Sequence, residues 1–185
     1  MDMQHDHLLD ILKNPLHKTK VEQLAETASA ESFSLKELID LTFHAEEQVA
    51  FRAAWILEYV YCRSSERLLA DAGYFLNRFH LQDNLSARRH YGKILALMTK
   101  KSAPHAVKQF IEGYKTEQLV DIAFSWLIDD NVPVAIKSHC LNILANLSTK
   151  HNWIREELLQ TMDFLVDKES VAFYAKVKQI RKQLK

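Results

Sequence analysis

Glycine and proline are scarce in this chain, and their scarcity excludes most β-rich folds. The 185 residues include only three glycines and three prolines, where average usage gives about thirteen and about nine. Sheets joined by hairpins need glycine at positions of positive φ in their tight turns. We therefore expect an all-α protein whose long helices are joined by short polar loops.

Cysteine is also scarce, and long apolar runs are missing. Cys62 and Cys140 lie 78 residues apart within apolar helical stretches, which predicts two reduced thiols packed in the core. The first residues lack the basic segment and the apolar stretch of a secretory signal. No run approaches the roughly 20 apolar residues that span a bilayer. These features predict a soluble, cytoplasmic protein that does not enter membranes.

The sequence lacks the motifs that catalysis and cofactor binding usually require. It has no G-x-S-x-G elbow, no glycine-rich phosphate loop and no Cys-x-x-Cys pair. Its nine histidines include no i, i+4 pair of the kind that binds zinc on a helix. We therefore predict that the chain is not an enzyme, with no catalytic residues, no metal site and no cofactor.

Apolar residues recur at helical spacing along the chain, which predicts about eight to ten helices. One helix is expected over 66–79. Another begins near Pro133, and its apolar residues fall at i, i+4, i+7, i+8 and i+11: Ile136, Cys140, Ile143, Leu144 and Leu147. Three tryptophans lie on similar apolar faces and are expected in the core: Trp55, Trp126 and Trp153.

One kind of helix occurs three times. Residues 50–57 read AFRAAWIL, residues 87–94 read ARRHYGKI and residues 135–142 read AIKSHCLN. Each begins with an alanine, any residue and a base, and leads into large apolar residues. The spacings of 37 and 48 residues fall in the range at which two-helix units of an α-solenoid recur. Because a solenoid normally presents a surface, this pattern favours a binding role.

Two of the three helices resemble the second helix of HEAT and armadillo-type repeats. The matching residues in the first are Val49, Arg52, Ala53, Ala54 and Leu57, and those in the third are Asn131, Val134, Lys137 and Leu141. The middle copy departs from the pattern, because Gly92 and Lys93 stand where apolar residues are expected. The resemblance covers residues 34–170. It implies an all-α, right-handed α-α superhelix of stacked helical hairpins, forming a single HEAT-like domain over 1–185.

In HEAT-like proteins the basic residue early in the second helix commonly lies along the inner, concave side of the stack. The resemblance therefore implies that Arg52, Arg89 and Lys137 form an inner row. These three residues are candidate partner-binding residues for that reason.

Charge is balanced overall but unevenly spread. The chain has 24 basic and 24 acidic residues, a neutral total that weakens any case for general nucleic-acid binding. Residues 61–110, however, hold nine bases and three acids. Within them, one helix predicted to run to Lys101 holds Arg88, Arg89, Lys93, Lys100 and Lys101. Arg89, Lys93 and Lys100 fall within about 100° on its helical wheel and can share a face. That face is either a solvated exterior or a patch for phosphates or an acidic partner.

The sequence thus predicts a non-catalytic protein-interaction module, an adaptor or regulator that binds a protein through a concave, partly basic face. An acidic protein suits the bases named above. The alternative is a nucleic-acid-binding protein resembling HEAT-like DNA-glycosylase scaffolds, which hold a duplex in a basic concavity.

Overall fold

The computed structural model describes residues 3–29 and 34–185. This part of the chain forms twelve α-helices and one short 3₁₀ helix, and it contains no strand. The prediction of an all-α fold is therefore confirmed. The described part of the chain also contains no helix that is both long enough and apolar enough to cross a membrane.

The helices divide into two compact units, Met1–Tyr91 and Gly92–Lys185. The first unit contains α1 (Met3–Lys13), α2 (Lys18–Ser29), α3 (Leu35–Leu41), α4 (Glu47–Arg63), α5 (Ser65–Leu69), α6 (Ala72–Asn77) and η1 (Phe79–Leu81). Helix α7 (Leu85–Met98) contributes to both units. The second unit contains α8 (His105–Gly113), α9 (Glu117–Ile128), α10 (Val134–Leu147), α11 (Trp153–Leu165) and α12 (Val171–Gln183). The single domain over 1–185 remains a prediction.

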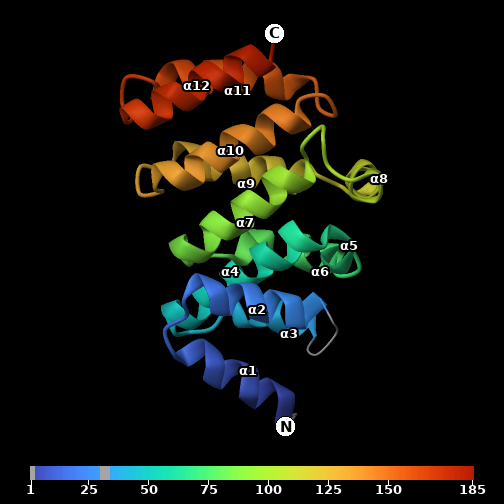
Figure 1. Ribbon diagram of the computed structural model, residues 1–185. Coiled ribbons are helices and arrows are strands. Elements are labelled where there is room, and N and C mark those ends of the chain that lie inside the picture. The colour runs from blue at the N-terminus through green and yellow to red at the C-terminus, as the bar shows by residue number, and fades with distance from the viewer. Residues whose placement is uncertain (1–2, 30–33) are drawn as a thin grey trace. The chain divides into compact units, whose positions relative to one another are not determined.

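Helix α4 is the centre of the first unit, where it packs against α1, α2 and α3 (Figure 1). It is apolar over most of its circumference, and Val49, Ala53 and Leu57 are fully buried. A helix of this kind is stable only when other helices cover it on several sides. The first copy of the repeated helix therefore lies where its composition predicts.

The helix predicted over 66–79 is divided into α5, α6 and η1. Two residues separate α5 from α6, and Gly73 follows the break. Glycine lowers helix stability by about 1 kcal/mol relative to alanine, so this stretch has little local preference for one continuous helix. Phe75 and Phe79 are nevertheless buried, and both contact the ring of Tyr91. This division accounts for part of the excess over the predicted eight to ten helices.

Helix α10 is the corresponding centre of the second unit and packs against α9, α11 and α12 (Figure 1). All five apolar residues of its predicted stripe are buried: Ile136, Cys140, Ile143, Leu144 and Leu147. Since the stripe was read from spacing alone, its burial confirms the helical period of this segment.

Gly92 explains why the middle copy departs from the repeat pattern. A Cβ atom built on Gly92 would lie 3.1 Å from the Cβ of His139 on α10. That separation is shorter than normal carbon–carbon contact distances. Glycine therefore allows α7 and α10 to approach closely within the second unit.

Two core predictions are wrong. Trp153 is 52% exposed, and its ring stacks on that of Phe124 with centroids 5.9 Å apart. It precedes the buried stripe that begins with Ile154 and continues through Leu158, so it lies about 100° away from that stripe. Cys62 is likewise exposed, whereas Cys140 is buried. Trp126 is buried as expected, and Trp55 is half-buried.

Candidate functional site

Three of the predicted binding residues bond to other residues of the protein: Arg52, Arg88 and Lys137. The Arg52 guanidinium donates to the carbonyl oxygen of Leu12 at 2.7 Å, near the end of α1. Cations at this position satisfy unpaired carbonyls and complement the helix dipole. Arg88 donates through Nε to the carbonyl oxygen of Gln82 at 2.6 Å. Both arginines are half-buried and hold the backbone of the first unit in place.

Lys137 is buried, which corrects the expectation that it lies on an exposed inner row. Its side chain is 1% exposed and its ammonium is paired with the carboxylate of Glu169. Glu169 lies between α11 and α12, so the pair ties this turn to α10. The basic residue of the third copy therefore makes an internal ion pair. Lys137 is too buried to contact a partner.

The remaining predicted cations are accessible. Arg89 is exposed on the part of α7 that belongs to the first unit. Lys93 is half-buried and Lys100 is exposed, and both belong to the second unit. Lys100 follows the end of α7 at Met98. The predicted helix through residue 101 is therefore shorter than expected.

Lys93 and Lys100 line a groove formed entirely by the second unit. One cavity of about 800 Å³ and another of about 660 Å³ share the side chains of Lys100, Lys101, Asn146 and Gln183. Because these shared residues join the two cavities, we treat them as one feature and call it the basic groove.

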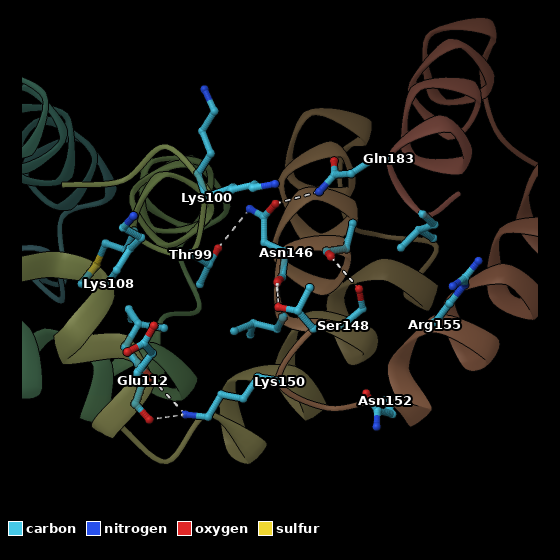
Figure 2. A pocket seen from close by; sticks show the side chains of 17 residues that line it. Thr99, Lys100, Lys108, Glu112, Asn146, Ser148, Lys150, Asn152, Arg155 and Gln183 are labelled. Atoms are coloured by element: carbon cyan, nitrogen blue, oxygen red, sulfur yellow. Dashed lines mark hydrogen bonds between the residues drawn. The ribbon is translucent and has the colours of Figure 1, made fainter. Parts of the chain in front are cut away.

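The walls of the basic groove come from helices that are distant in sequence. Lys100 and Lys101 follow α7, and Lys108 lies on α8. Asn152 and Arg155 form the opposite side (Figure 2). Lys93 and Lys176 extend the cationic lining into the second cavity. Glu112 is the single acidic residue of the combined lining, so the groove carries strong excess positive charge.

Asn146 fixes the floor of the basic groove. Its Nδ2 donates to the carbonyl oxygen of Ala96 at 3.1 Å and to Oγ1 of Thr99 at 3.2 Å. Its Oδ1 accepts a hydrogen bond from Nε2 of Gln183 at 2.9 Å. One side chain of α10 thereby joins the end of α7 to the end of α12 (Figure 2).

Lys150 orders another part of the same lining. Its Nζ donates to the carbonyl oxygens of Ile111, Glu112 and Tyr114, at 3.0, 3.0 and 2.6 Å. These carbonyls lie at the end of α8, where a helix has unsatisfied acceptors. Lys150 thus holds the end of α8 in position beside the groove.

Lys176 differs from the other lysines of the groove. Partial burial lowers the pKa of its ammonium below the ordinary lysine value, because desolvation penalises the charged form. Its Nζ donates to Oε1 of Gln179 at 2.9 Å. An anion bound near it would favour the charged form and oppose this lowering of the pKa.

The structure identifies groove residues that sequence reasoning missed. No sequence pattern distinguishes Lys108, Asn146 or Arg155 from other residues of their helices. The base-rich segment 61–110 indicates only the wall that carries Lys100, Lys101 and Lys108. Among the described residues, no group of three or more His, Cys, Asp or Glu side chains could hold a metal ion.

A comparison with family profiles found one match, described as a HEAT repeat domain, over residues 8–184. This range takes in both compact units and all three copies of the repeated helix. Searches of curated proteins and of solved structures found no significant match.

Proposed function

The chain belongs to the HEAT repeat family, and from that premise we propose that it is a protein-interaction module whose partner binds in the basic groove. HEAT repeats commonly mediate protein interactions, and the family is generally a non-catalytic scaffold. The proposed role is that of an adaptor or regulator that acts by holding a partner. We also propose a cytoplasmic location, since exposed Cys62 suits a reducing compartment.

The observation that carries this proposal is the cationic lining on two sides of an ordered floor. Lys100 and Lys108 on one side and Arg155 on the other are exposed. The floor between them is tied by the three hydrogen bonds of Asn146. A preformed surface loses less conformational entropy when it binds, which favours affinity. Positive walls also accelerate the encounter with a negatively charged partner.

Charge reversal in the groove tests the proposal. The test variant is Lys100→Glu/Lys101→Glu, and the matched control is Lys115→Glu/Lys182→Glu. The control residues are exposed in the same unit and lie outside the groove lining. Each protein is used for affinity capture from native lysate with and without nuclease, followed by mass spectrometry. Circular dichroism and thermal midpoints establish that all three proteins are folded.

We expect a set of proteins to be captured by wild type and control and lost from the groove variant, with nuclease having no effect. Equal capture by the groove variant would contradict the proposal. Loss of the captured set on nuclease treatment would instead support the nucleic-acid-binding alternative, because the contact would then depend on a nucleic acid.

A further inference from the structure

We infer that the basic groove binds an extended acidic peptide segment in which aliphatic side chains stand between the carboxylates. The inference rests on the proposed function and specifies the chemistry of the partner. Four properties of the lining support it: where the charges lie, which apolar residues stand between them, where the amide side chains are, and the lack of Phe, Tyr and Trp.

The cations are spaced along the groove. Lys108 and Arg155 lie along the first cavity, Lys100 and Lys101 belong to both cavities, and Lys176 belongs to the second. A ligand that satisfies them must therefore carry several negative charges along its length. An extended peptide presents side chains at about 3.3 Å per residue, which spreads its carboxylates in this way.

Apolar side chains also line the groove between these cations. Met98, Ile111, Leu147 and Leu184 contribute to the first cavity, and Ala96 and Leu97 contribute to the second. Leu97 is half-buried and the other five are at most 8% exposed, so each offers only a small apolar edge. Aliphatic side chains of a ligand would cover these edges, and burial of apolar surface is the main favourable term in most associations.

Amide side chains at the groove suit a peptide backbone. Asn142 and Gln179 line the second cavity and Asn152 lines the first. An extended peptide has backbone N–H and C=O groups that no neighbouring strand satisfies. An amide side chain offers both a donor and an acceptor, so it pairs with either group.

The same lining is poorly suited to single-stranded nucleic acid. All of its residues belong to the described part of the chain, and none of them is Phe, Tyr or Trp. Binding of single strands typically depends on bases that stack on aromatic rings. Arg155 is also the single arginine among the lining residues, whereas bidentate phosphate recognition favours arginine over lysine.

Fluorescence anisotropy with labelled synthetic probes tests the inference. The probes have equal length: a peptide of alternating Glu and Leu, one of alternating Glu and Ser, one of alternating Lys and Leu, and an oligothymidylate. Each is titrated with the full chain, with Lys100→Glu/Lys101→Glu and with the control Lys115→Glu/Lys182→Glu. Repeating the titrations at higher ionic strength measures the electrostatic share of binding.

We expect the Glu/Leu peptide to bind most tightly and the Lys/Leu peptide not to bind. The Glu/Ser peptide should bind at least about fivefold more weakly, and the groove variant should lose at least about tenfold in affinity for Glu/Leu. The control variant should bind like wild type. Added salt should weaken binding of the Glu/Leu peptide.

Three results would overturn the inference: tighter binding of oligothymidylate than of Glu/Leu, equal binding of Glu/Ser and Glu/Leu, or no binding of any peptide. The capture experiment separates this inference from the proposed function. If Lys100→Glu/Lys101→Glu loses protein partners but no peptide binds, the peptide chemistry is wrong and the protein-binding role stands. If capture is unchanged as well, both are wrong.

Discussion

Gln183 donates a hydrogen bond to Oδ1 of Asn146 at 2.9 Å, and this contact joins the end of α12 to α10 at the floor of the basic groove. On its other side Asn146 donates to Ala96 and Thr99. The amide therefore uses its donors and its acceptor to connect three helices. Asn146 thereby fixes how these helix ends lie around the groove.

Replacing Asn146 with alanine should destabilise the protein and weaken groove binding together. The substitution removes three hydrogen bonds of a half-buried side chain, which we expect to cost about 1–3 kcal/mol. Urea denaturation measures the change. Gln160→Ala is the matched control, since Gln160 is an exposed amide on α11 of the same unit and lies outside the groove lining. Its effect on stability should stay within about 0.5 kcal/mol. Equal effects of the two substitutions would contradict the role of Asn146.

Gly92→Ala should destabilise the protein, although alanine is the better helix former by about 1 kcal/mol. The new Cβ would lie 3.1 Å from the Cβ of His139, so α7 and α10 must separate to accept it. We expect a net loss of about 1 kcal/mol or more in chemical denaturation.

Gly73→Ala is the control for that experiment, because a Cβ on Gly73 has nothing within 4 Å. It lies in α6, so the substitution should stabilise the protein by up to about 1 kcal/mol. If both substitutions stabilise the protein, the close approach of α7 and α10 does not constrain residue 92.

Lys137→Met should be strongly destabilising, whereas Lys137→Met/Glu169→Gln should recover most of the loss. The single substitution leaves the carboxylate of Glu169, whose side chain is 17% exposed, without its cation. Breaking a buried pair costs about 3–5 kcal/mol, and partial exposure of Glu169 places the expected value near the lower end. A double-mutant cycle in urea measures the coupling. Additive effects would show that the pair contributes nothing specific.

Alkaline pH should destabilise the protein partly through Tyr61. Burial and, to a smaller extent, the nearby Cys62 side chain raise the pKa of Tyr61 from 10.0 to about 12. The unfolded state therefore releases this proton first, so stability is fully present below pH 10 and is lost as pH rises toward 12. By pH 11 the expected loss from this group is about 1 kcal/mol.

Tyr61→Phe should reduce the loss of stability between pH 9 and pH 11, followed as the urea midpoint. Tyr59→Phe is the control, because Tyr59 is a half-exposed residue of the same helix. A loss of stability that is identical in wild type and Tyr61→Phe would contradict the raised pKa.

The sequence predicted the helical class and the stripe on α10 because both follow from local chemistry. Scarce glycine and proline exclude tight turns, and helical periodicity places Ile136 and Leu144 on one face whatever the partner helices are. The same logic failed for Trp153 and Cys62. Each is next in sequence to a buried residue. Adjacent residues on a helix point about 100° apart, so one can face the core while the next faces solvent.

The sequence by itself determined that one helix is repeated and that the chain belongs to the HEAT repeat family, since periodicity and repeat spacing are local properties. Only the tertiary structure decided which groups the repeated bases contact. Arg52 and Lys137 share one place in the repeat, yet Arg52 binds a backbone carbonyl and the buried Lys137 binds the partly exposed carboxylate of Glu169. The basic groove was also decided there, because Lys100, Asn146 and Arg155 become neighbours only when α7, α10 and α11 pack together.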